Sequence, residues 1–174
     1  MSTTPSPEAQ TDTRNFAYAK VRRMPSEMLL DAVCQVTGGQ VKFGSLPLGA
    51  RAIQVADGPS GNYFLEVFGR PMRDTACSSE RRSDPTLAQA LHLINGDTMT
   101  RAIQTPAGRL DAAVTSNAPT EDAVKDLYTA AFARQPSGEE LTQLAGYING
   151  AADRRLAMED VYWSVLNSKE FVFN

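Results

Sequence analysis

Cysteine and histidine are scarce in this sequence, and their scarcity excludes the common metal and haem sites. The 174 residues include two cysteines and one histidine. A structural zinc site needs about four Cys or His ligands, and covalent haem attachment needs a Cys-x-x-Cys-His motif, which is missing here. We therefore expect no metal and no cofactor. Cys34 and Cys77 could form a disulfide if the protein is exported, although free thiols are the commoner state for so few cysteines.

Long apolar runs are missing as well. No stretch approaches the roughly 18 consecutive apolar residues of a transmembrane helix, so we expect no membrane span. The chain lacks a basic segment followed by an apolar one near its N-terminus, so we expect no signal peptide within it. Positive charge is not in excess either, because the net charge is -3. Nucleic-acid-binding proteins present a basic face, and nucleic acid is therefore not an expected partner.

What the sequence does contain fits an ordinary globular domain. Hydrophobic residues make up 42% of the chain and charged residues 21%, which is enough apolar material for a packed core. Residues 1–14 are the exception, because Ser, Thr, Pro and Gln dominate them and large apolar side chains are nearly absent. We expect these residues to form a disordered tail, and residues 15–174 to form a single helical domain.

Helical signals recur along residues 15–174. Pro25 opens one helix that Gly38 ends, and the capping box of Ser137 and Glu140 opens another. Further helices are expected over residues 63–68, 97–104, 107–114, 120–133 with Thr120 as cap, and 152–167 with Leu156 facing inward. The fold class is therefore predicted to be mainly α, a domain of about six to seven helices.

The helical pattern of residues 84–95 is particularly clear. Asp84 suits the N-cap, and Pro85 suits the first helical position. The apolar stripe of this helix consists of Leu87, Ala90, Leu91 and Ile94. By contrast, residues 38–62 are rich in Gly and Pro, so they are predicted to be a long irregular connection with at most a short extended piece at residues 50–56.

The central block, residues 62–97, concentrates the reactive side chains. Its arginines include Arg70, Arg73 and Arg81, and guanidinium groups bind carboxylate, sulfate or phosphate. Nearby acids such as Glu80 neutralise most of this charge, so an internal network of arginines and acids is the favoured alternative. In that interpretation Arg70 and Arg81 fix residues 69–83 through bonds to acids and main-chain carbonyls.

Cys77 and His92 allow a second chemical interpretation. A thiol and an imidazole can act as nucleophile and general base, and the neighbouring arginines would lower the pKa of the thiol. No third residue that would orient His92 is marked by the sequence, so a structural role for this histidine is the favoured interpretation.

Several short stretches resemble a planctomycete-specific domain of unknown function. They are residues 22–32, 49–52, 68–71, 87–96, 127–128 and 166–171, together with Cys77 and Glu80-Arg81, Arg134 and Pro136, and Glu140-Leu141. The resemblance extends over about residues 20–174. The family often has Cys-x-Cys-Glu-Arg, but Ser79 replaces the second cysteine here, which puts a metal or redox role of that pair in doubt.

The resemblance implies a cellular context rather than a reaction. In that family the domain is the C-terminal module of large exported proteins of the cell envelope, which typically also carry cytochrome-c-like domains. The family domain is usually longer at its N-terminus, so this chain is expected to be its C-terminal part. The resemblance therefore implies export as part of a larger protein, with neighbouring domains or cell-envelope components as partners.

Two functions remain open at this point. The first is a non-enzymatic accessory or interaction domain that holds neighbouring domains or binds a cell-envelope polymer. The second is an enzyme or an electron-transfer accessory. Its site would be formed by Arg51, Arg70, Arg73, Cys77, Glu80, Arg81 and His92.

Overall fold

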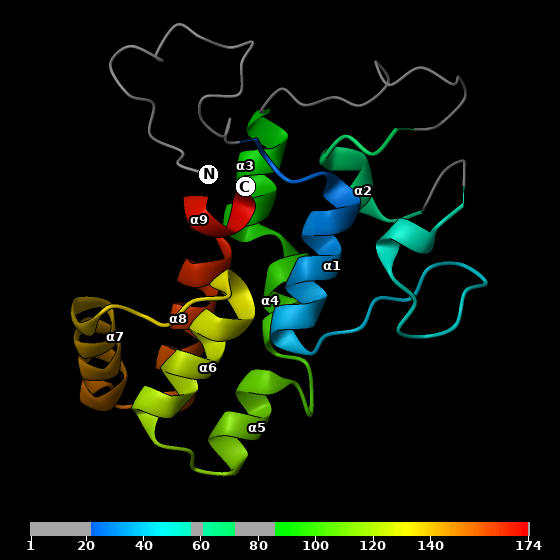
Figure 1. The fold of residues 1–174 in the computed structure, drawn as a ribbon. Helices are drawn as coiled ribbons and strands as arrows, with labels where there is room; N and C mark the ends of the chain where they lie inside the picture. The colour runs from blue at the N-terminus through cyan, green and yellow to red at the C-terminus, as the bar shows by residue number, and fades with distance from the viewer. Residues whose placement is uncertain (1–21, 57–60, 72–85, 174) are drawn as a thin grey trace, which may run out of the picture.

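The fold is helical throughout the part of the chain that can be described (Figure 1). A computed structural model describes residues 22–56, 61–71 and 86–173. The elements in chain order are α1 (Ser26–Thr37), the 3-10 turn η1 (Ala52–Gln54), α2 (Tyr63–Val67), α3 (Leu87–Asn95), α4 (Asp97–Ile103), α5 (Arg109–Thr115), α6 (Thr120–Phe132), α7 (Gly138–Gly150), α8 (Arg154–Leu166) and α9 (Lys169–Val172). This confirms the predicted mainly α fold class. No helix in these ranges is long and apolar enough to cross a membrane.

Helix α1 is the central element of the fold. It contacts α2, α4, α5, α6 and η1, and Figure 1 shows it (blue) between the other helices. Leu29, Leu30, Val33 and Val36 recur on one face and are fully or almost fully buried. As predicted, the helix ends at Gly38, whose φ of 77° places it in the left-handed region and whose N–H donates to the Cys34 carbonyl.

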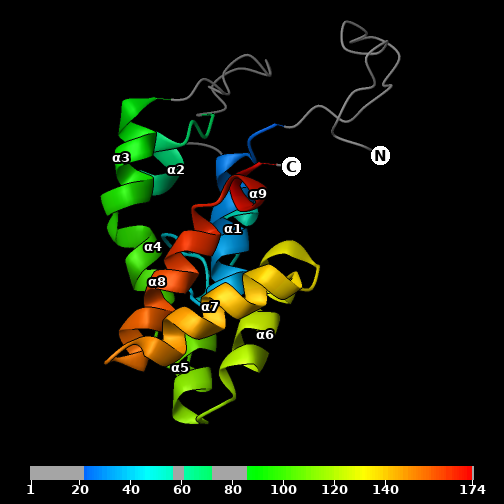
Figure 2. The same ribbon diagram turned by 90° about the vertical axis from the view of Figure 1, so that its left-hand side faces the viewer.

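The C-terminal helices form an antiparallel layer beside α1. Figures 1 and 2 show α6, α7 and α8 running in alternating directions. The predicted capping box of α7 is confirmed, because the Ser137 hydroxyl accepts from Glu140 N at 3.2 Å and Ser137 N donates to the Glu140 carboxylate at 2.7 Å. After α8, the short α9 buries Phe171 and Val172. Met24 N then donates to the Val172 carbonyl at 2.9 Å, so the start and end of the described chain lie together.

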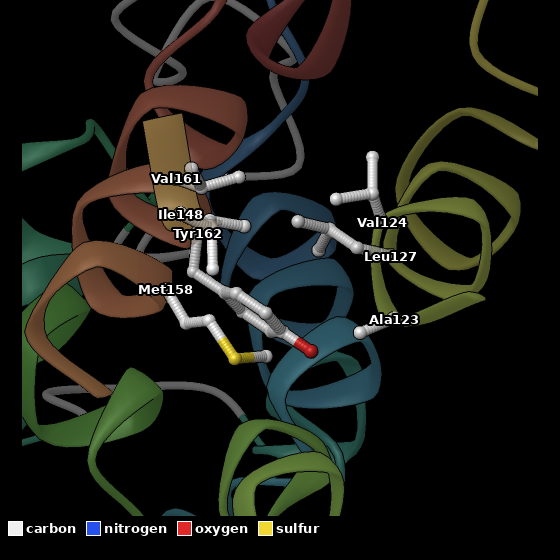
Figure 3. A pocket seen from close by; sticks show the side chains of 7 residues that line it. All are labelled: Ala123, Val124, Leu127, Ile148, Met158, Val161 and Tyr162. Atoms are coloured by element: carbon white, nitrogen blue, oxygen red, sulfur yellow. The ribbon is translucent and has the colours of Figure 1, made fainter. Parts of the chain in front are cut away.

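Figure 3 shows a cavity inside this C-terminal layer, lined by the apolar side chains of α6, α7 and α8. Its volume of about 10 Å³ is at the lower limit for a single water molecule. Tyr162 lies among these side chains, and burial raises the pKa of its hydroxyl. This cavity is therefore a small packing gap in the core and has no room for an organic ligand.

Several sequence-based expectations about elements are wrong. The expected extended piece at residues 50–56 contains the 3-10 turn η1 instead, because Asp31 accepts the N–H groups of Ala52 and Ile53. Thr120 is the first residue of α6 and not its cap, and Leu156 is exposed. The short α9 was not expected, because periodicity alone does not reveal a helix of four residues.

The start of α3 also differs from the prediction. The helix begins at Leu87, with Thr86 as N-cap, since the Thr86 hydroxyl accepts from Gln89 N at 3.3 Å and Thr86 N donates to the Gln89 side chain at 3.2 Å. The start predicted at Asp84 and Pro85 is therefore wrong, and those two residues lie outside the described ranges. The tail predicted at residues 1–14 also lies outside them.

Candidate functional site

Three of the predicted site residues can be placed in the structure. Arg51, Arg70 and His92 belong to the described ranges. The others lie outside these ranges: Arg73, Cys77, Glu80 and Arg81. The proposed pairing of Cys77 with His92 or with Cys34 therefore stays a prediction, as does the anchoring role of Arg81.

Arg70 is a buried arginine that binds the main chain. It follows α2, only 8% of its surface is exposed, and its Nη2 donates to the carbonyls of Val55 at 3.0 Å and Ala56 at 2.7 Å. A buried guanidinium needs such acceptors to offset the loss of its hydration. Arg70 therefore attaches the segment after η1 to the end of α2 through main-chain carbonyls. Its role in fixing residues 69–83 stays a prediction.

Arg51 lies in a different environment, at the start of η1. Its Nε is 3.4 Å from a carboxylate oxygen of Asp31, and 66% of the Arg51 side chain is exposed. The Asp31 carboxylate also accepts from Ala52 N at 2.6 Å and from Ile53 N at 3.4 Å. Asp31 thereby fixes η1 against α1 and places the guanidinium of Arg51 at the surface, beside a cavity that also includes Cys34.

The Cys34 thiol is a poor nucleophile in this position. Burial raises its pKa to about 11, and the nearby negative charge of Asp31 adds to the shift. The thiolate is the reactive form of cysteine, so at neutral pH this side chain is protonated and behaves as a small apolar group.

His92 lies on α3 in an aromatic environment made by α2. Its ring centroid is 5.4 Å from that of Tyr63, 5.6 Å from that of Phe64 and 6.1 Å from that of Phe68. Its Nε2 is 3.0 Å from the Thr98 hydroxyl. Burial lowers the pKa of the imidazole, while the charge of Asp97 acts in the opposite direction. A neutral imidazole held in this way joins α2, α3 and the start of α4.

Helix α3 buries a glutamine and exposes two leucines, the reverse of the usual pattern. Its polar side chains face the protein: Gln89 is 4% exposed, donates to the Val67 carbonyl at 3.0 Å and accepts from Arg23. Its leucines face outward, because Leu87 is 75% exposed and Leu91 is 51% exposed. The apolar stripe predicted from the sequence therefore exists, but on the solvent side for these two leucines. Figure 2 shows α3 at the edge of the molecule, beside α2 and above α4.

Each of the described candidates is bound to a different partner. Arg51 binds Asp31, Arg70 binds the carbonyls of residues 55 and 56, and His92 binds Thr98. Within the described ranges, no group of three or more His, Cys, Asp and Glu side chains could hold a metal ion.

A charged cluster that the sequence did not mark as a unit joins α6, α7 and α9. Arg134 makes a two-bond contact with Glu140, with both distances 2.9 Å, and a second one with Glu170, at 2.7 and 2.8 Å. Its guanidinium also lies over the rings of Tyr128 and Phe132, 5.3 and 5.4 Å from their centroids. The stretches that resemble the planctomycete-specific domain include Arg134, Glu140 and Glu170. Nothing in the sequence indicated that these three side chains contact one another. The spacing to Glu170 gives no local signal, because it spans 36 residues.

The comparisons with known proteins find one matching family, whose function is unknown. A family model described as "PSD1: Protein of unknown function (DUF1553)" matches residues 1–148, which is most of the 174 residues. The match ends before the similar stretch at residues 166–171. No curated protein and no solved structure matches the chain.

Proposed function

The chain belongs to PSD1, a family of proteins of unknown function (DUF1553), and because that membership assigns no activity, we propose from the geometry that it is a non-enzymatic interaction domain. Its docking surface consists of the outward leucines of α3, Leu87 and Leu91, together with Tyr63 of α2. The partner is an apolar surface of a neighbouring domain in the same larger protein.

The observation that carries this proposal is the orientation of α3. A helix on the surface of a soluble domain normally buries its leucines and exposes its glutamines. Here Gln89 is buried while Leu87 and Leu91 are exposed. Moving two leucines from water into an interface provides about 1.5–3 kcal/mol each when the side chain becomes fully buried. Adjacent exposed apolar side chains of this kind mark interaction surfaces.

Tyr63 extends the same surface across α2. It is 64% exposed, and its ring packs against His92 of α3 with 5.4 Å between the ring centroids. Tyrosine combines a large apolar area with a hydroxyl that can bond across an interface, and it is enriched at such sites. The proposed docking surface, Tyr63 with Leu87 and Leu91, therefore combines apolar area with one polar group.

The cellular setting of this proposal comes from the resemblance to the planctomycete-specific domain. We propose that the chain acts outside the cytoplasm, in the periplasm or cell envelope, as part of an exported multidomain protein with cytochrome-c-like domains. Fractionation of cells that make the protein should find it in the envelope or periplasmic fraction. Recovery in the cytosolic fraction alone would contradict this setting.

A photo-cross-linking amino acid in place of Leu91 tests the docking surface directly. In cells that make the protein, ultraviolet light should attach residue 91 to another domain of the same protein, and mass spectrometry of the joined peptides should identify it. The same amino acid in place of Glu139, which is exposed on α7, is the matched control and should give no such product. Equal products from both positions, none from position 91, or attachment to a cell-envelope polymer would each contradict the proposed partner.

The alternative of an enzyme or electron-transfer accessory has less support in the described residues. The thiol of Cys34 has a raised pKa, and Arg70 is bound to main-chain carbonyls. Four residues of that alternative site, Arg73, Cys77, Glu80 and Arg81, lie outside the described ranges.

A further inference from the structure

A second feature, independent of the proposed docking surface, is a cavity beside α1. It lies between the C-terminal half of this helix and the chain that leads from the helix to η1, coloured light blue to cyan in Figure 1. Its volume is about 420 Å³, within the range of about 300–1,000 Å³ that is usual for small-molecule sites. It is therefore large enough for an organic ligand, unlike the gap shown in Figure 3.

The walls of this cavity are fixed by hydrogen bonds within the chain. Asp31 holds the residues of η1 on one side, with its carboxylate 2.6 Å from Ala52 N. On the other side, the Thr37 hydroxyl donates to the Val33 carbonyl at 2.8 Å and accepts from Gly39 N at 3.1 Å. Phe43 is buried and anchors the middle of the connecting chain. A site with fixed walls binds a ligand without a large ordering cost.

Two charged side chains line the cavity, Arg51 and Asp31, and of these Arg51 is the accessible one, since the Asp31 side chain is only 10% exposed. Asp31 contacts three N–H donors, from Ala52, Ile53 and Arg51. Among the described residues, Arg51 forms one ion pair, with Asp31. The Arg51 side chain is 66% exposed, so its guanidinium is accessible to a ligand. A guanidinium can bind a carboxylate through two parallel hydrogen bonds.

The remainder of the lining is partly apolar and partly amide. Val41, Phe43 and Ala50 contribute apolar surface, and the protonated Cys34 thiol adds to it. Gln35 and Gln40 contribute side-chain amides, which can donate and accept hydrogen bonds. We propose that this cavity binds a small carboxylate with a compact apolar body, whose carboxylate is held by Arg51.

Titration of the whole chain with benzoate tests this proposal. In ¹H–¹⁵N spectra, the amide signals of Gly38, Gly39 and Gly49, which line the cavity, should move with a saturable dependence on benzoate. Gly138 and Gly146 of α7 provide internal controls and should stay in place. Benzyl alcohol has the same ring but no charge, so it should bind more weakly.

Two variants separate the carboxylate contact from a general charge effect. Arg51→Gln should weaken benzoate binding about tenfold, because a charge-assisted two-bond contact is lost, and it should leave benzyl alcohol binding unchanged. Arg101→Gln removes the same charge from an exposed position on α4 and should bind benzoate like the wild type. The same spectra show whether each variant is folded. Unmoved cavity glycines, or equal benzoate affinity of Arg51→Gln and wild type, would overturn the proposal.

Discussion

A buried guanidinium needs acceptors, and Arg70 finds them in the carbonyls of Val55 and Ala56. Its side chain thereby joins the end of α2 to the segment after η1, because Val55 and Ala56 precede Arg70 by 15 and 14 residues. At the scale of single residues, this contact and the cluster around Arg134 are two examples of one arginine that connects separate parts of the chain. Each of them leads to a separate prediction.

Arg70→Ala is expected to lower the free energy of unfolding by about 1–3 kcal/mol, because the carbonyls it binds lose a charged donor. Arg101→Ala is the matched control. Its side chain is 80% exposed and pairs only with Asp97 on the same helix among the described residues, so its loss should cost less than about 1 kcal/mol. Urea denaturation of both variants beside the wild type measures the difference. Equal midpoints for Arg70→Ala and wild type would show that the buried contact contributes nothing.

The Arg134 cluster predicts a dependence of stability on pH. Hydrogen bonds from Arg134 are the main reason that the pKa of Glu140 falls from 4.5 to about 2, with Ser137 N contributing further, and Arg134 also lowers the pKa of Glu170. A carboxyl whose pKa is lower in the folded state stabilises the fold above its unfolded pKa. This stabilisation should be present above pH 4.5 and be lost as the pH falls toward about 2.

Urea denaturation at a series of pH values checks this dependence. The Arg134→Gln variant should lose less stability than the wild type between pH 4.5 and about 2, because its Glu140 has lost the main cause of the pKa shift. Since these side chains are partly exposed, solvent screening will keep the effect modest. Parallel pH curves for the two proteins would contradict the assigned role of Arg134.

At the scale of elements, the junction between α1 and α5 depends on the absence of a side chain. Gly108 caps the start of α5, and a Cβ atom there would lie 2.7 Å from the Thr37 carbonyl oxygen and 2.9 Å from that of Thr105. Next to it, Arg109 Nε donates to the Val36 carbonyl at 2.8 Å, which satisfies one of the open carbonyls at the end of α1. Close approach of the two backbones allows this contact.

A pair of glycine substitutions tests that junction. Gly108→Ala is expected to lower the free energy of unfolding by about 1–3 kcal/mol, because main-chain atoms would have to move. Gly146→Ala in α7 is the control, since no atom lies within 4 Å of the added Cβ, and it should raise stability by about 0.4–1 kcal/mol. Thermal denaturation of both variants measures the two signs. A neutral or stabilising Gly108→Ala would mean that α1 and α5 tolerate a wider separation.

The elements that the sequence predicted well are those specified by neighbouring residues. The capping box of Ser137 and Glu140 and the left-handed Gly38 are local signals, and both are confirmed. The turn η1 was missed because its start depends on Asp31, 21 residues earlier in the chain. The periodicity of α3 identified Leu87 and Leu91 as a stripe, but periodicity cannot say which side of a helix packs against the rest of the chain.

Less of the candidate site than of the helices could be predicted from the sequence. The sequence proposed Arg51, Arg70 and His92 as members of a ligand site, which stays a prediction. The partners that the structure gives them are distant in the chain, belong to the main chain or lie on a following helix. Cys34 was considered only for a disulfide. Its place in the cavity beside Arg51 depends on how the connection after α1 returns to that helix, and the spacing of residues in the sequence does not encode that return.

At the scale of the whole molecule, the described residues form a hydrophobic core around α1. Helix α3 packs against the rest of the chain with one side and exposes two leucines on the other. The core takes its apolar side chains from α1, α2 and α4 to α9, and the buried face of α3 adds Leu93 to its edge. Leu87 and Leu91 remain outside it. The central claim is therefore that these two leucines serve an interaction and contribute little to the stability of this chain.

The free energy of unfolding of the double variant Leu87→Gln/Leu91→Gln tests this claim most directly. Glutamine forms helices about as well as leucine, so the change should remove apolar surface without disturbing α3. The account predicts a loss of less than about 1 kcal/mol, whereas Leu93→Gln, on the same helix but packed against the core, should cost more. A loss of about 2 kcal/mol or more in the double variant, the range for core leucines, would show that the two leucines belong to the core and would contradict the docking surface.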